Sequence, residues 1–131
     1  MKAVRVLVVE DDALVGPLLG EMLAGMGYAV CAIETTENDA ISAAMRFLPD
    51  LMIVDERLGE GSGTRAVAAI LTAGPVPHVF ISGDVSAIGL FRPDAEVLQK
   101  PFRAAELERA IARVLGDHRG PLRTRITARR R

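Results

Sequence analysis

The chain has 131 residues and a formal net charge of −1, and half of its residues are apolar. This length allows one domain with a proper core, and this composition excludes a disordered chain. No apolar run approaches the roughly 18 residues of a membrane-spanning helix, and residues 6–9 are too few for the apolar region of a secretory signal. The single cysteine, Cys31, excludes an internal disulfide and a cysteine-based zinc site. We therefore expect a soluble, cytoplasmic protein.

Strand-like and helix-like segments alternate along most of the chain. Nearly continuous apolar runs predict five buried strands, and apolar residues at helical spacing predict four helices. In the first predicted helix this spacing includes Leu14 and Leu18, with Asp12 as a candidate cap and Gly27 at the end. The predicted strands cover residues 4–9, 28–33, 51–54, 77–82 and 95–98, and the predicted helices cover residues 14–26, 37–47, 64–73 and 104–115.

This alternation predicts an α/β fold with a doubly wound, five-stranded parallel sheet that carries helices on both faces. Residues 56–63 are polar and glycine-rich, so we expect a loop between the third strand and the third helix. Residues 84–94 contain Gly89, Pro93 and few periodic apolar residues, so a fourth helix there would be short or frayed.

Charge is unevenly distributed and divides the chain into two parts. Residues 1–116 carry 10 basic and 16 acidic side chains, a net charge of −6, whereas residues 117–131 carry six arginines and one aspartate, a net charge of +5. We expect residues 1–116 to form the domain and residues 117–131 to be a flexible basic tail. Such a tail could also bind nucleic acid or an acidic partner, but it is too short for a helix-turn-helix DNA-binding domain.

Polar residues follow four of the predicted strands, at the edge where an open parallel sheet binds its ligands. Three consecutive acids follow the first strand, and a single aspartate follows the third. A serine follows the fourth strand, and a lysine follows the fifth. In this fold the four positions converge, which brings together Glu10, Asp11, Asp12, Asp55, Ser82 and Lys100.

Clustered carboxylates stay ionised only beside a compensating cation. Oxygen ligands without a neighbouring His or Cys favour Mg²⁺ and disfavour zinc. Asp55 stands alone at the end of a central strand, and an aspartate can attack phosphorus to form an acyl phosphate. Ser82 could donate to one phosphoryl oxygen, and Lys100 could neutralise another. The residues therefore predict a magnesium-dependent phosphoryl-transfer site.

Each of these residues also has an ordinary structural explanation. Asp12 fits a helix cap, and a strand-end aspartate such as Asp55 fits a turn. Ser82 fits the start of a loop, and Lys100 before a proline fits the start of a helix. Their joint occurrence, at the correct end of four strands, favours the functional interpretation for the group, while Asp12 remains best explained as a cap.

Four motifs of the chain resemble the receiver domains of two-component response regulators. They are LVVEDD at residues 7–12, IVDERLGEGSG at 53–63, VFISG at 79–83 and VLQKPF at 97–102. The resemblance covers roughly residues 3–116 and implies a flavodoxin-like fold with strand order 2-1-3-4-5. The variant looks like a stand-alone, chemotaxis-regulator-like receiver.

The resemblance implies a role for each acidic residue of the site. Asp55 corresponds to the phospho-accepting aspartate, which is also a metal ligand. Asp11 corresponds to a direct Mg²⁺ ligand, and Glu10 to an acid that acts through water. The backbone carbonyl of Arg57, two residues after Asp55, corresponds to a further ligand.

The resemblance also implies that Ser82 follows the phosphoryl group and that Lys100 is the family's invariant lysine, joined to Pro101 by a cis peptide bond. Two positions depart from the family pattern. Val97 stands where the family usually has Tyr or Phe, so the usual aromatic switch is absent. Arg103 stands where an N-capping Asp is common.

Together these features predict a single-domain response regulator that is not an enzyme beyond its own phosphorylation and dephosphorylation. We expect it to accept a phosphoryl group on Asp55 from a sensor histidine kinase or a phosphotransfer protein, and to signal by phosphorylation-dependent partner binding or phosphorelay transfer. We expect a protein as its downstream target, no membrane partner and no DNA-binding domain, and a homodimer is a further assembly to test.

Two alternative functions stay open. The first is a phosphorylation-independent interaction module that retains the receiver fold and keeps the metal site only as structure. The second is a small phosphohydrolase of similar architecture. That enzyme would need a second acid–base residue two positions after the nucleophile, where this chain has Arg57.

Overall fold

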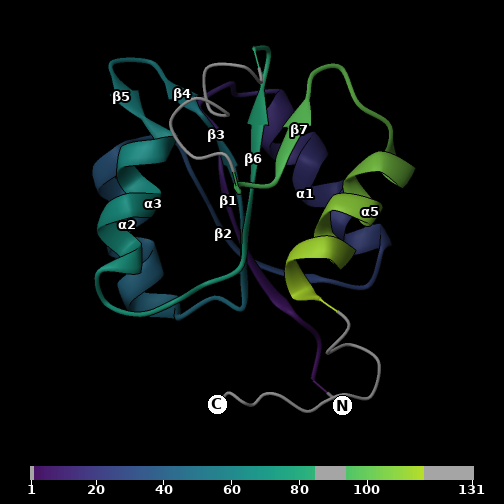
Figure 1. Ribbon diagram of the computed structural model, residues 1–131, viewed down its shortest axis with the longest axis horizontal. Coiled ribbons are helices and arrows are strands. Elements are labelled where there is room, and N and C mark those ends of the chain that lie inside the picture. The colour runs from purple at the N-terminus through teal and green to yellow at the C-terminus, as the bar shows by residue number, and fades with distance from the viewer. Residues whose placement is uncertain (1, 85–93, 117–131) are drawn as a thin grey trace.

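A five-stranded parallel sheet forms the centre of the computed structural model, which describes residues 2–84 and 94–116 (Figure 1). Its strands are ordered β2-β1-β3-β6-β7. This is the expected order 2-1-3-4-5, because a small hairpin outside the sheet takes the labels β4 and β5. The strands are β1 (Arg5–Val9), β2 (Ala29–Glu34), β3 (Leu51–Asp55), β6 (His78–Ser82) and β7 (Val97–Gln99).

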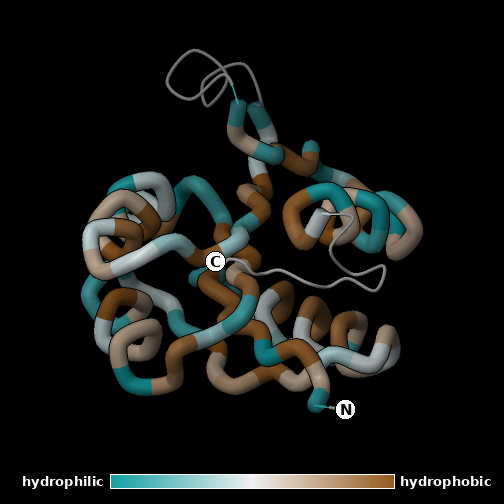
Figure 2. The backbone as a smooth tube through the Cα atoms, turned by 60° about the horizontal axis from the view of Figure 1, so that its bottom comes forward, coloured by the Kyte–Doolittle hydropathy of each residue, from teal (hydrophilic) through white to brown (hydrophobic). Residues whose placement is uncertain are grey.

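Helices cover both faces of the sheet, with α2 and α3 on one side and α1 and α5 on the other (Figure 1). Leu7 and Val9 of β1 pack with α2 and α3, whereas Val6 and Val8 pack with α1 and α5. Burial on both faces explains the continuous apolar runs, and hydrophobic segments gather at the centre of the fold (Figure 2). The helices are α1 (Val15–Gly25), α2 (Glu37–Phe47), α3 (Gly63–Leu71) and α5 (Ala104–Leu115).

The predicted boundaries agree with these elements to within two residues, with one addition. The predicted loop at residues 56–63 contains a two-stranded antiparallel hairpin, β4 (Arg57–Leu58) and β5 (Gly61–Ser62). Two-residue strands carry too little periodicity to be recognised in a sequence. The expected fourth helix, within residues 84–94, and the expected tail at residues 117–131 fall on segments outside the described residues.

The helical spacing predicts that the apolar residues of α1, and Leu14 just before it, face the core, but two of them do not. Leu14 and Leu18 are 76% and 61% exposed, whereas Gly16 and Gly20 are buried. A Cβ atom on either glycine would lie 3.1 Å from the side chain of Ile33 in β2. The two glycines let α1 lie close to the sheet, so the helix turns them inward and leaves the two leucines in solvent.

The described helices are short. The longest of them, α5, has 12 residues. Within residues 2–84 and 94–116, none combines the length and the apolar character that crossing a membrane requires.

Candidate functional site

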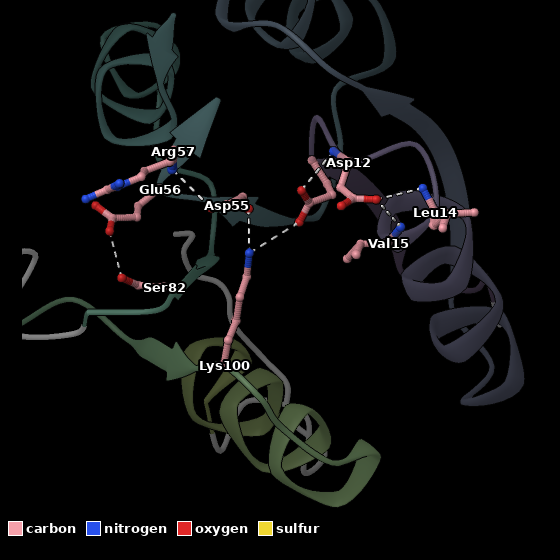
Figure 3. Close-up of polar contacts among 9 residues, drawn as sticks. Asp12, Leu14, Val15, Asp55, Glu56, Arg57, Ser82 and Lys100 are labelled. Atoms are coloured by element: carbon pink, nitrogen blue, oxygen red, sulfur yellow. Dashed lines mark hydrogen bonds and ion pairs between the residues drawn. The ribbon is translucent and has the colours of Figure 1, made fainter. Parts of the chain in front are cut away.

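The carboxyl ends of β1, β3, β6 and β7 bring the predicted polar residues to one edge of the sheet (Figure 3). Glu10, Asp55 and Ser82 are 2%, 5% and 0% exposed, and they are the buried polar residues of the part of the chain that the structure describes. Lys100 follows β7 and is half-buried. Burying charged groups is costly unless they are paired, so compensating contacts are expected among them.

A cavity of about 560 Å³ lies over this edge of the sheet. Its lining includes the four residues predicted as metal ligands and the predicted lysine, namely Glu10, Asp11, Asp55, Arg57 and Lys100. Ser82 does not line the cavity, because its side chain is fully buried, and its hydroxyl donates to Glu56, which does line it. The structure therefore brings the predicted residues to one edge of the sheet, but Ser82 is not among the residues that line the cavity.

Three carboxylates meet in this cavity. Glu10, Asp11 and Asp55 each place one oxygen so that the three atoms lie within 4.8 Å of one another. Oε1 of Glu10 is buried and has no hydrogen-bond partner, while Oε2 accepts the backbone N–H of Asp12 at 3.1 Å. Burial raises the pKa of Glu10 to about 7, although the bond from Asp12 opposes it. A divalent cation would give the orphaned oxygen a partner and keep the carboxylates ionised, so these residues fit Mg²⁺.

A lysine ammonium lies among these carboxylates. Nζ of Lys100 donates to Oδ2 of Asp55 at 2.8 Å and lies 3.9 Å from Oε1 of Glu10, which is beyond hydrogen-bond distance. Burial alone would lower the pKa of Lys100, but the bond to Asp55 and the charges of Asp55, Glu10 and Asp11 together raise it. The expected cis peptide bond joins Lys100 to Pro101.

Asp55 ends β3 and is held at both carboxylate oxygens. Oδ2 accepts from Lys100, and Oδ1 accepts the backbone N–H of Arg57 at 3.0 Å. Gly63 packs against the same strand so closely that a Cβ atom there would overlap the carbonyl oxygen of Asp55. The carboxylate is thereby fixed in orientation at the wall of the cavity.

Asp12 has the structural role that its position before a helix suggested. Its Oδ1 accepts the backbone N–H groups of Leu14 at 2.8 Å and Val15 at 3.1 Å. These two bonds lower the pKa of Asp12. Asp12 therefore caps the turn that leads into α1, and it is not part of the three-carboxylate cluster.

One contact at this edge could not be predicted from the sequence. Oγ of Ser82 donates to Oε1 of Glu56 at 2.8 Å and accepts the backbone N–H of Asp84 at 2.9 Å (Figure 3). Glu56 directly follows Asp55, but an acid at the start of a glycine-rich loop gives no signal for a partner 26 residues away. Its position beside the strand-end aspartate was the one available hint.

The fold and the site together define a class of protein. Acids after the first strand of the sheet, an aspartate at the end of the third, a serine at the end of the fourth and a lysine after the fifth form the arrangement of a receiver domain. The sequence profile of the response regulator receiver domain matches residues 6–112 of this chain. The chain therefore belongs to the response regulator receiver family.

Known proteins similar to this chain differ in their overall function. The phyllosphere-induced regulator PhyR of Methylorubrum extorquens is 29% identical over 86% of this chain and 44% of that protein. Protein-glutamate methylesterase/protein-glutamine glutaminase 4 of Geobacter metallireducens is 33% identical over 79% of this chain and 28% of that protein. The chain thus spans less than half of the length of these two relatives.

Solved receiver structures agree with the fold. The solution structure of the PhyR response regulator REC domain from Erythrobacter litoralis is similar with a TM-score of 0.78 at 27% identity. The similarity covers 88% of this chain and 92% of that chain. The common part is therefore the receiver domain itself.

Proposed function

We propose that this chain is a phospho-accepting signalling domain in which Asp55 receives a phosphoryl group from a phosphohistidine. The placement of Asp55 carries the proposal. Its carboxylate is buried, bonded to the Lys100 ammonium, and grouped with the carboxylates of Glu10 and Asp11 at one cavity. An aspartate that only shaped a turn would gain nothing from burial beside two further acids.

The transfer can be written on the protein's own atoms. An oxygen of the Asp55 carboxylate attacks the phosphorus atom of the donor. The P–N bond to the donor imidazole breaks, its electron pair returns to the nitrogen, and an acyl phosphate forms on Asp55. Lys100 already contacts this carboxylate, so its ammonium can neutralise a phosphoryl oxygen. The donor would be a sensor histidine kinase or a phosphotransfer protein.

The carboxylates of Glu10, Asp11 and Asp55, with the backbone carbonyl of Arg57, would hold Mg²⁺ in the cavity. When bound, the ion neutralises charge on the phosphoryl oxygens. Without a cation the clustered carboxylates would repel an incoming phosphoryl group. The proposal therefore includes a requirement for Mg²⁺ in phosphorylation.

The signal would leave the site through Ser82 and the two residues that follow it, Gly83 and Asp84. Val97, at the position of the usual aromatic residue, pairs with Phe80 of β6 and packs against the apolar cluster under α2 and α3. Ser82 would donate a hydrogen bond to a phosphoryl oxygen on Asp55, and the backbone at Asp84, which is bonded to Ser82, would move with it. The output is phosphorylation-dependent partner binding or onward phosphoryl transfer.

Incubation of the full chain with acetyl phosphate and Mg²⁺ tests this function. We expect the intact mass to rise by one phosphoryl group and Asp55→Asn to abolish this gain. Asp39→Asn is the matched control, because Asp39 is an exposed aspartate in α2 that does not line the cavity. A native protein that gains no phosphoryl group would contradict the proposal and favour a phosphorylation-independent interaction module.

A further inference from the structure

The hydroxyl of Ser82 is bonded to Glu56, and the buried Ser82 does not itself line the cavity that Asp55 and Glu56 line. The distance from Oγ of Ser82 to Oε1 of Glu56 is 2.8 Å, and Glu56 is half-buried. In Figure 3 the pair of Ser82 and Glu56 lies apart from the contact between Asp55 and Lys100. The residue that would contact a phosphoryl group is therefore engaged with a second carboxylate.

The backbones that carry this pair are anchored. The N–H of Glu56 donates to the carbonyl of Ile81 at 3.0 Å, and the carbonyl of Glu56 accepts the N–H of Gly63 at 2.8 Å. The carbonyl of Ser82 accepts the N–H of Lys100 at 2.9 Å. A change in the contact between Ser82 and Glu56 must therefore come from their side chains and from Gly83 and Asp84, which follow β6.

The same hydroxyl also bonds the backbone two residues further along the chain. Its oxygen accepts the backbone N–H of Asp84 at 2.9 Å while its proton is donated to Glu56. The Oγ atom of Ser82 thus connects the Glu56 carboxylate to the backbone of Asp84. A rotation of the Ser82 side chain that moves Oγ changes both contacts together.

We propose that Glu56 is a positioning residue that latches the Ser82 hydroxyl in the unphosphorylated arrangement and opposes the switch that phosphorylation of Asp55 produces. This inference rests on the proposed function. A hydroxyl has one proton to donate, so on the phosphorylated protein the Glu56 carboxylate and a phosphoryl oxygen compete for it. A charge-assisted hydrogen bond is about twice as strong as a neutral one, so Glu56 shifts the equilibrium toward the unswitched arrangement.

Beryllofluoride, which imitates a phosphoryl group on an aspartate, tests the latch in the full chain with saturating Mg²⁺. Glu56→Asp keeps the negative charge but shortens the side chain by one methylene group, which removes the contact with Ser82. We expect this variant to bind beryllofluoride about tenfold more tightly than the native protein in calorimetric titration. Glu60→Asp, the same change at an exposed position of the same loop, is the matched control and should bind like the native protein.

The Ser82→Ala background separates the latch from simple charge repulsion. Without the hydroxyl, Glu56→Asp should change the beryllofluoride affinity by less than about twofold, since the hydrogen bond between Ser82 and Glu56 is already absent. An unchanged tenfold effect in this background, or native affinity for Glu56→Asp alone, would overturn the latch. A native protein that binds no beryllofluoride would instead refute the proposed function, and the latch with it.

Urea unfolding without Mg²⁺ or beryllofluoride reports the hydrogen bond itself. The effects of Glu56→Asp and Ser82→Ala on the free energy of unfolding should be non-additive, because each substitution removes the same contact. Additive effects would show that the two side chains do not interact in solution and would also overturn the latch.

Discussion

Lys100 and a metal ion would compete for the same carboxylates, because Nζ of Lys100 contacts Asp55 at 2.8 Å and lies 3.9 Å from Glu10. Lys100→Ala removes this positive charge. We expect the variant to bind Mg²⁺ about tenfold more tightly, which corresponds to ~1.4 kcal/mol and is modest for a partly screened unit charge at this distance. Calorimetric titration with Mg²⁺ measures the change.

The chain offers a matched control for this substitution. Lys2 is its other lysine, and its side chain is exposed. Lys2→Ala changes the net charge equally and should leave the Mg²⁺ affinity within about twofold of the native value. Equal affinities for the native protein and Lys100→Ala would show that the ammonium does not oppose metal binding.

Gly63 lies so close to β3 that there is no room for a Cβ atom. A Cβ atom there would overlap the carbonyl oxygen of Asp55 and lie 2.7 Å from Cγ1 of Val54. We expect Gly63→Ala to lower the free energy of unfolding by about 3 kcal/mol, because the β3 backbone must shift. Urea denaturation measures this loss.

Gly25→Ala is the comparison for that substitution. A Cβ atom added to Gly25, which is exposed at the end of α1, would meet no atom within 4 Å apart from its chain neighbours and the backbone of its own helix. The free energy of unfolding should stay unchanged or rise by less than about 1 kcal/mol. If Gly63→Ala were as stable as Gly25→Ala, the start of α3 could move away from β3 without cost in free energy.

At the scale of single elements, α5 begins without a side chain that caps its first N–H groups. The N-cap residue, Arg103, has an extended backbone, and its own N–H donates to the Glu106 carboxylate at 2.7 Å. A guanidinium has no acceptor to return to the helix. We expect Arg103→Asp to raise the free energy of unfolding by about 1 kcal/mol. Arg103→Ala removes the same charge without adding an acceptor, so equal stability of the two variants in urea would contradict the cap.

The β4–β5 hairpin is tied to α2 by Glu37. The carboxylate of Glu37 accepts from the guanidinium of Arg65 at 3.0 Å and from the backbone N–H of Ser62 at 3.0 Å. These bonds, with that of Arg65 the larger cause, lower the pKa of Glu37. A carboxyl group of this kind stabilises the fold above its ordinary pKa, and the stabilisation disappears as pH falls through its folded-state value.

The contact of Glu37 therefore predicts a pH-dependent difference. We expect Glu37→Gln to be less stable than the native protein at about pH 7, and the difference to vanish at about pH 2. Urea unfolding across this range measures it. In an Arg65→Gln background the difference should be smaller at neutral pH, whereas a difference that stays constant with pH would show that the charge of Glu37 contributes nothing.

At the scale of the whole molecule, α5 completes the apolar cluster on its face of the sheet. Val114 and Leu115 still pack against that cluster, and Gly116 follows with a φ of 72°. We expect a chain of residues 1–116 to match the full chain in free energy of unfolding to within ~0.5 kcal/mol. Urea denaturation of both chains checks this, and a loss above ~1 kcal/mol would place part of the tail within the domain.

Most of the fold could be predicted because β1 and β3 are buried on both faces and therefore read as continuous apolar runs. Two features could not. The β4–β5 hairpin is too short to show a period of two. The inward face of α1 includes Gly16 and Gly20 beside Leu19 and Leu23, and the two glycines have no hydrophobic signal until Ile33 of the neighbouring strand is placed against them.

The sequence by itself determined which elements form and which polar residues reach one edge of the sheet. Local burial patterns decide the elements, and the common direction of parallel strands decides the edge. Only the tertiary structure decided which hydrogen bonds and ion pairs those residues form. It leaves an oxygen of Glu10 without a hydrogen-bond partner and bonds the buried Ser82 hydroxyl to Glu56. Such choices depend on distances between residues far apart in the chain, which no local pattern of residue types encodes.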